Sequence, residues 1–112
     1  MVEYHQKKRI VIKLSGSIFS LSDNHDQDSN NYYNIFKQYR DILANLTSNV
    51  QLIVITGGGS IARLYINFAR KLGLDEASLD LLGIAISRVN AKLLIASLGH
   101  YAYPEVRISL DD

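Results

Sequence analysis

The chain has 112 residues, of which 47% are hydrophobic and 21% are charged, and its formal net charge is +1. This length is typical of a single domain, and the near-neutral charge provides no overall field for binding nucleic acid or an anionic membrane. The absence of cysteine excludes disulfides, thiolate zinc sites and a catalytic thiol, and it suits a reducing cytosol. No uninterrupted apolar run approaches the roughly 20 residues that span a bilayer. We therefore expect a soluble, cytoplasmic protein with no membrane or nucleic-acid partner.

The first half of the chain predicts a strand, a loop and a helix. Ile-Val-Ile-Lys-Leu at residues 10–14 is nearly continuous and β-branched, which predicts a strand buried on both faces, as in a parallel sheet. A turn follows at residues 15–17. Residues 22–34 are rich in Asp, Asn and Ser, and we expect a surface loop there. From Tyr32 to Leu46, apolar residues recur at the three- and four-residue spacing of an amphipathic helix.

The second half predicts a strand followed by two helices. Leu-Ile-Val-Ile at residues 52–55 predicts a second buried strand, which is closed by a threonine and three glycines. An apolar stripe over residues 61–72 predicts a helix that ends at Gly73. Acidic residues at positions 75–76 suit the first turn of a third helix, whose apolar positions continue to about Leu98.

The third predicted helix has one internal weak point and a clear end. Gly83 lies inside it, where glycine costs about 1 kcal/mol relative to alanine unless close packing requires it. We expect the helix to stop at Gly99. Val-Arg-Ile at residues 106–108 then predicts a short third strand.

The order of the predicted elements indicates an α/β fold. Strands separated by helices imply right-handed crossovers and a parallel sheet that helices cover on both faces. Two or three apolar strands, however, present two apolar faces and two open edges, which is more than three helices can close. Either an edge of the sheet pairs with another chain or a further part of the sheet is missing. We favour the second interpretation.

Two glycine-containing turns, each after a predicted strand, are candidate phosphate sites. Lys-Leu-Ser-Gly-Ser at residues 13–17 combines a cation, backbone N–H groups and small hydroxyls. Gly-Gly-Gly-Ser at residues 57–60 leaves its backbone open and begins a helix, whose N–H groups and positive dipole end attract anions. In a parallel sheet both turns lie at the edge where α/β proteins bind ligands. Two such turns suit a phosphoryl-transfer enzyme with two phosphorylated ligands.

Each candidate residue also has a purely structural explanation. A triple glycine is most often only a tight turn, and neither the P-loop spacing nor the dinucleotide-binding spacing is present. Lys13 within an apolar strand is rare without a partner, which leaves a functional or an ion-paired role. Arg63 falls in the first turn of its helix, where the dipole disfavours a cation unless a phosphate is bound, and it is otherwise a solvated arginine. Asp80 lies in mid-helix, where most such residues are simply exposed, and the histidines share no metal-ligand spacing, so we predict no protein metal site.

Three segments, taken together, carry a resemblance to a known family. They are Ile-Val-Ile-Lys-Leu-Ser-Gly-Ser at residues 10–17, Ile-Thr-Gly-Gly-Gly-Ser-Ile-Ala-Arg at residues 55–63, and Leu-Asp-Leu-Leu-Gly-Ile at residues 79–84 with Ser-Arg-Val-Asn-Ala at residues 87–91. In this order they resemble the amino acid kinase superfamily and, within it, the archaeal type of UMP kinase (uridylate kinase). The runs at residues 79–84 and 87–91, together with Arg63, favour UMP kinase over the acetylglutamate, carbamate, aspartate and isopentenyl phosphate kinases of the same superfamily.

The resemblance implies a three-layer αβα sandwich with a mainly parallel sheet, of which residues 1–112 would be the amino-terminal part of one domain. It implies a hexamer that uses Mg²⁺ to transfer the ATP γ-phosphate to UMP, giving UDP for pyrimidine nucleotide synthesis. Lys13 would be the catalytic residue, because it would neutralise charge on the transferred group. The residues implied in ATP binding are Lys13, Leu14, Ser15, Gly16, Ser17, Gly59 and Arg63. Those implied in UMP binding are Gly57, Gly58 and Asp80.

Only the amino-terminal half of this family's pattern is present in the sequence. The second half, which holds the adenine site and another catalytic lysine in the family, does not follow Asp112. We therefore expect at most half an active site in this chain. Two alternatives remain: a non-catalytic nucleotide- or phosphate-binding half-domain that pairs with a complementing chain or only oligomerises, and another kinase of the superfamily with a different acceptor.

Overall fold

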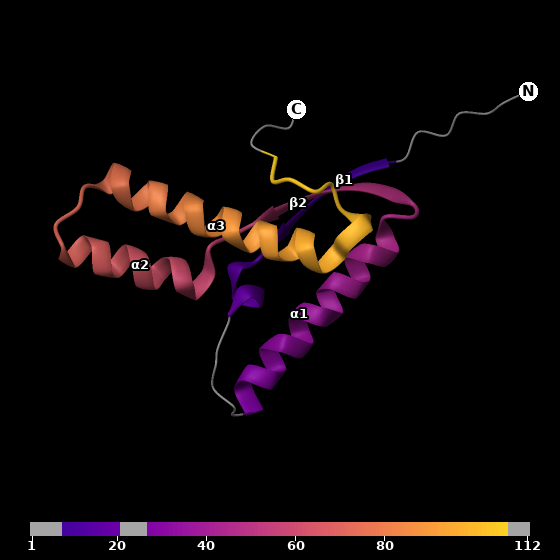
Figure 1. The fold of residues 1–112 in the computed structure, drawn as a ribbon, viewed down its shortest axis with the longest axis horizontal. Helices are drawn as coiled ribbons and strands as arrows, with labels where there is room; N and C mark the ends of the chain where they lie inside the picture. Colours follow the sequence, from indigo (N-terminus) through magenta and orange to yellow (C-terminus); the bar gives the residue numbers. More distant parts are fainter. Residues whose placement is uncertain (1–7, 21–26, 108–112) are drawn as a thin grey trace, which may run out of the picture.

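The computed structural model describes residues 8–20 and 27–107, which form two strands, three α-helices and two short 3₁₀ turns. The strands are β1 (Lys8–Leu14) and β2 (Val50–Thr56), and the helices are α1 (Gln27–Leu46), α2 (Gly59–Lys71) and α3 (Glu76–Leu98). The 3₁₀ turns are η1 (Gly16–Phe19), which follows β1, and η2 (Gly99–Tyr101), which follows α3. Figure 1 shows α1 diverging from the paired helices α2 and α3, with the strands behind them.

The two strands pair in parallel along their whole length. Their register runs from Lys8 opposite Val50 to Leu14 opposite Thr56. Both strands are rich in β-branched residues, which favour extended backbone, and α1 is the crossover that a parallel pair requires. Because the last residues of β1 and β2 lie opposite each other, the chain leaves both strands at the same level. The predicted parallel β-α-β arrangement is therefore confirmed.

The hydrophobic core lies on one face of this sheet. Its buried residues and those packed against them are Ile12, Leu14, Ile18, Phe19, Phe36, Leu43, Leu52, Val54, Leu94 and Leu98. The strand members of this set alternate along β1 and β2 and therefore share one face. α1 and α3 both supply side chains to that same face. The ring of Phe19 is 1% exposed and meets Phe36 edge-on, with the ring centroids 5.7 Å apart.

The opposite face of the sheet is open. Val11 is 56% exposed and Ile55 is 47% exposed, and beside them the exposed Arg9 Nε donates to Gln51 Oε1 at 3.2 Å. The prediction that both strands are buried on both faces is therefore wrong for the described residues. The reason is that α1 and α3 cover the same face, and no described helix covers the other. The second edge of β2 is also unpaired within the described sheet.

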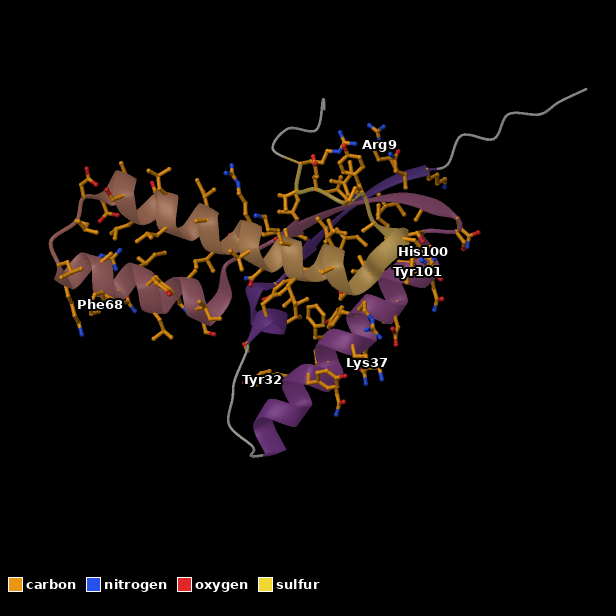
Figure 2. The ribbon with its side chains drawn as sticks, viewed as in Figure 1. Arg9, Tyr32, Lys37, Phe68, His100 and Tyr101 are labelled. Carbon is orange, nitrogen blue, oxygen red and sulfur yellow. The ribbon has the colours of Figure 1, made fainter. Side chains whose placement is uncertain are left out.

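α2 and α3 form a helical hairpin that projects from the sheet (Figure 1). Small residues, Ala62 and Ala69, are buried on α2, and Leu79 is buried on α3, so the two helices pack closely. α2 ends before Gly73, whose φ of +84° favours glycine, and Asp75 caps α3 by accepting the N–H of Ser78 at 3.0 Å. Both predicted boundaries are confirmed, as is the end of α3 at Leu98. On the far side of the hairpin, Figure 2 shows Phe68 pointing from α2 away from α3.

The predicted start of α1 and the predicted third strand are wrong. α1 begins at Gln27, so the loop expected over residues 22–34 is helical from that point, while residues 22–26 lie outside the described residues. Polar residues such as Asp and Ser suit a helix N-terminus, which has free N–H groups and a positive dipole end, so a helix can start without an apolar stripe. Residues 106–107 form no strand and line an open hollow beside β2, and Ile108 lies outside the described residues.

α3 is rich in apolar residues, although polar residues interrupt every apolar run in it. Among the described residues it is the one helix long and apolar enough to cross a membrane by length and composition, a test that core helices also pass. α3 packs against α2, β2 and α1, but only 11% of its most apolar stretch is buried, so the described residues leave most of its apolar surface uncovered. The radius of gyration is 16.8 Å, against about 13 Å for a globular domain of this length. The chain is therefore extended, and apolar side chains such as Leu81 and Val89 are exposed on α3.

Candidate functional site

The turns that follow β1 and β2 meet backbone against backbone at the carboxyl edge of the sheet. A Cβ atom added to Gly16 would collide with the N and Cα atoms of Gly59, and one added to Gly59 would collide with the carbonyl oxygen of Gly16. A Cβ atom on Gly57 would lie 3.4 Å from the nitrogen of Gly16. No side chain separates the turns at this point. The predicted juxtaposition of the two glycine turns is therefore present in the structure.

Serine hydroxyls line the first turn. Ser15 caps η1, since its Oγ accepts the N–H of Ser17 at 3.3 Å, and the two hydroxyl oxygens lie 3.0 Å apart. Both serines are exposed, and a hydroxyl can rotate to donate to a phosphate oxygen. The next residues, Ile18 and Phe19, are buried in the core and anchor the turn to it. The first turn thus combines a fixed backbone with two accessible hydroxyl groups.

The second turn leads directly into α2 without any capping side chain. Gly58 is the N-cap residue and makes no side-chain cap, and a Cβ atom there would collide with Ala62. Gly59 has a φ of +66°, in the left-handed region that favours glycine. The first N–H groups of a helix have no partner within it, and together with the helix dipole they attract anions. This turn can therefore receive a phosphate through its backbone.

α3 holds the second turn in place with part-buried hydrogen bonds. The Asn90 Nδ2 donates to the carbonyl oxygen of Gly57 at 2.8 Å and to that of Gly58 at 3.3 Å. The Thr56 hydroxyl donates to the carbonyl oxygen of Ser87 at 2.9 Å. From the sequence, Asn90 has no predicted role beyond its place in a motif. The signal that could have found it is a polar residue on the buried stripe of an otherwise apolar helix face.

An open hollow lies beside the second turn. It has a volume of about 2000 Å³, follows the free edge of β2, and is bordered by α2, α3 and residues 101–107. Gly58, Gly59, Arg63 and Asp80 line it, so four of the predicted ligand-binding residues are brought together. Small-molecule pockets usually enclose about 300–1,000 Å³, so this hollow is an unclosed groove and not a finished pocket. Arg63 and Asp80 are both exposed to solvent there.

Two predicted residues lie differently from expectation. Lys13 is exposed on the open face of the sheet, opposite Ile55 in the register, and it does not line the hollow. The prediction that Lys13 lies in a strand buried on both faces is therefore wrong. Because its side chain is exposed to solvent, Lys13 does not need an ion-pair partner. Leu14 is 5% exposed and its side chain belongs to the core, so only its backbone is left to meet a ligand.

Comparison with known proteins agrees with this geometry. The model of the amino acid kinase family matches residues 8–112. The chain belongs to the amino acid kinase family. Uridylate kinase from Methanosarcina mazei is 46% identical over 97 residues, which cover 87% of this chain and 38% of that protein. Uridylate kinase from Sulfolobus acidocaldarius is 42% identical over 105 residues, which cover 93% of this chain and 42% of that protein.

A solved member of the amino acid kinase family has the same fold. The crystal structure of uridylate kinase from Archaeoglobus fulgidus superposes with a TM-score of 0.72 at 31% identity, covering 91% of this chain and 42% of that one. This chain therefore spans about two fifths of the length of these relatives, namely 38% and 42% of the two proteins and 42% of the solved chain. The predicted α/β fold with a parallel sheet, present as a partial domain, is confirmed, as is the resemblance to archaeal uridylate kinases.

The described residues hold no cluster of metal-ligating side chains. Among them, no group of three or more His, Asp or Glu side chains lies close enough together to hold a metal ion. In kinases Mg²⁺ is usually bound by one or two carboxylates together with the substrate phosphates.

Proposed function

We propose that this chain is the amino-terminal part of a UMP kinase, which transfers the γ-phosphate of ATP to UMP and yields ADP and UDP. The observation that supports this proposal best is the backbone contact between Gly16 and Gly59, because it joins two turns that are open to phosphates. Relatives named uridylate kinase, at 46% and 42% identity, support the choice of substrates. The same relatives favour this acceptor over those of other kinases in the superfamily.

The proposed reaction is a direct displacement. An oxygen of the UMP phosphate attacks the γ-phosphorus of ATP, and the bond from that phosphorus to the β-phosphate oxygen breaks, so that ADP leaves without a covalent enzyme intermediate. Lys13 neutralises charge on the transferred group, and backbone N–H groups hold phosphate oxygens. The ATP side consists of Lys13, Leu14, Ser15, Gly16, Ser17, Gly59 and Arg63. The UMP side consists of Gly57, Gly58 and Asp80.

The proposal extends to the cofactor, the assembly and the location. Mg²⁺ accompanies ATP and is held mainly through its phosphates, because this ion is usually bound by one or two carboxylates together with substrate phosphates. The working protein is soluble and cytoplasmic. It is a homo-oligomer, a hexamer in the resembled family, or it works with a complementing second half.

A fusion protein tests the proposed activity. It joins this chain to the part of the Methanosarcina mazei uridylate kinase that lies beyond the matched region, and ADP formation is measured with UMP, with CMP and without an acceptor. We expect ADP formation that depends on UMP. The relative's part alone and this chain alone serve as controls. Turnover of another phosphate acceptor with none for UMP would overturn the assignment.

Asp80 provides a sharper test of the acceptor side. It lines the hollow near Gly58, so we expect Asp80→Asn to raise the KM of the fusion protein for UMP. Asparagine keeps an acceptor oxygen but loses the charge, and a hydrogen bond to a charged group contributes about 1 kcal/mol more than a neutral one, which corresponds to roughly fivefold to tenfold in KM. The KM for ATP should stay unchanged. Asp41→Asn, at an exposed position of α1 whose residue does not line the hollow, is the matched control and should change neither constant.

A second candidate function is a nucleotide-binding half-domain that acts with another chain. The open face of the sheet, with Val11 and Ile55 exposed, and the unpaired edge of β2 favour it. Titrating ATP and UMP into the 112-residue chain while its mass in solution is followed separates the candidates. Binding that requires association, without turnover in the fusion protein, supports the half-domain. Turnover by a monomer excludes it.

A further inference from the structure

We propose that Asn90 is a positioning residue for the phosphate turn. Its buried side-chain amide holds the carbonyl groups of Gly57 and Gly58 against α3 and thereby aims the N–H groups of Gly58 and Gly59 away from α3, toward a bound phosphate. The inference rests on the proposed function only for the identity of the ligand, a nucleotide phosphate. The arrangement of the turn itself stands on the contacts of Asn90.

Asn90 is buried, and its amide makes one short and one longer hydrogen bond to the turn. Nδ2 lies 2.8 Å from the oxygen of Gly57 and 3.3 Å from that of Gly58, and the residue is only 3% exposed. Two carbonyl oxygens can face only the NH₂ end of an amide, so the donor side of Asn90 is toward the turn. A buried polar side chain costs free energy unless it is hydrogen-bonded, so these bonds tie α3 firmly to the turn.

The geometry of the peptide unit converts these bonds into an orientation. In a trans peptide the C=O group and the following N–H group share one plane and point in opposite directions, and no described peptide bond is cis. With the Gly57 carbonyl held toward Asn90, the N–H of Gly58 points away from α3. The Gly58 carbonyl fixes the N–H of Gly59 in the same way.

A glycine turn needs such an anchor more than other turns do. Glycine has the widest choice of backbone conformations, so three consecutive glycines leave their peptide planes free to rotate. Among the described residues, neither the N–H of Gly58 nor that of Gly59 donates a hydrogen bond within the protein. Preorganised N–H groups bind an anion without first having to reorient, which is how fixed donors gain their effect in phosphoryl transfer.

The test uses nuclear magnetic resonance on the isotope-labelled 112-residue chain, with inorganic pyrophosphate and UMP as probes. In the parent chain we expect a through-hydrogen-bond coupling between the Asn90 Nδ2 and the carbonyl carbon of Gly57. We also expect pyrophosphate to shift the amide resonances of Gly58 and Gly59. Absence of either signal overturns the proposal without the need for a variant.

Two substitutions remove the donor in different ways. Asn90→Asp keeps the shape of the side chain and loses its NH₂ group. Asn90→Leu also loses the NH₂ group but does not bury a charge. Either variant tests the proposal, provided that it folds. We expect pyrophosphate and UMP to bind about tenfold more weakly, the factor that corresponds to the loss of about one or two hydrogen bonds. Ser97→Ala is the control, because its hydroxyl donates to the carbonyl oxygen of Leu94 on the same helix at 2.8 Å and the residue does not line the hollow. It should keep binding.

The outcomes separate this inference from the proposed function. If the fusion protein uses UMP and its Asn90 variants show unchanged kcat and KM, the positioning role is wrong while the function stands. If the fusion protein does not use UMP but the Asn90 variants lose pyrophosphate binding that Ser97→Ala keeps, the positioning role stands and the function is wrong. A loss of binding that matches the loss of stability equally in all three variants shows a merely structural role and overturns the proposal.

Discussion

Gly16 and Gly59 lie in backbone contact, although they belong to turns that follow different strands. The register of the sheet explains why they meet, because Leu14 and Thr56 end their strands opposite each other. The two glycines are needed for different reasons. Gly16 is restricted only by the neighbouring backbone, whereas Gly59 also has a φ of +66°. Gly16 is therefore required by packing alone, whereas Gly59 is required by packing and by its backbone conformation.

We predict that Gly16→Ala pushes the two turns apart. The added methyl group meets backbone and not a flexible side chain. We therefore expect the free energy of unfolding to fall by about 1–3 kcal/mol, the usual cost of overpacking, and pyrophosphate binding to be lost. Gly59→Ala should cost more, because a left-handed conformation adds roughly 1–2 kcal/mol. Unfolding in urea and titration with pyrophosphate measure the two effects.

Gly73→Ala is the matched control for this comparison. Gly73 also has a positive φ, of +84°, but a Cβ atom there would meet nothing within 4 Å. We expect a loss of stability from backbone strain alone and unchanged pyrophosphate binding. If Gly16→Ala binds pyrophosphate as the parent chain does, contact between the turns does not matter for the site.

Lys13 should matter for activity and not for stability. Its side chain is exposed on the open face of β1, so Lys13→Met should change the free energy of unfolding by less than about 0.5 kcal/mol. In the fusion protein, loss of a charge that stabilises the transition state should lower kcat by about 10²–10³. Lys8→Met removes an exposed lysine from the start of the same strand and should leave kcat unchanged. Equal effects of both substitutions would contradict a specific role for Lys13.

Gly83→Ala should stabilise the chain. A Cβ atom at Gly83 would lie 3.5 Å from Ile66 Cδ1, an ordinary contact, so the close packing that would justify glycine in mid-helix is not present. We expect a gain of about 1 kcal/mol, read as a higher urea midpoint. Ala85→Gly, at an exposed position of α3, should lose a similar amount. A loss of UMP binding by Gly83→Ala would instead show that this glycine serves the ligand, since it lines the hollow.

Local signals predicted the ends of the helices and the place of the glycine turns. Gly73, Asp75 and Gly99 act on their immediate neighbours, so the limits of α2 and α3 were readable without a structure. The meeting of Gly16 and Gly59 followed from one further premise, that the strands are parallel, because parallel strands end at a common edge. These features depend on short stretches of sequence or on topology alone.

Burial could not be predicted in the same way. Val11 and Ile55 have the composition of a buried strand, yet they are exposed, since burial depends on whether another layer packs on that face. The start of α1 was missed because its first turns carry no apolar stripe. Asn90 was missed because its partners, Gly57 and Gly58, lie on a distant segment and no local pattern connects them.

Asp75 should make the stability of the chain depend on acid. Hydrogen bonds to the side chain and the backbone N–H of Ser78 lower the pKa of Asp75 below its ordinary value of 3.8. The unfolded chain therefore takes up this proton first, so the stabilisation is complete above about pH 4 and is lost as the pH falls through the folded-state pKa. Asp75→Asn still caps α3 but does not titrate, so it should be less stable than the parent at neutral pH and approach it in acid, as measured by urea unfolding across pH. Asp41→Asn removes a carboxylate that caps no helix and should not reproduce this convergence, whereas a constant difference for Asp75→Asn at every pH would contradict the argument.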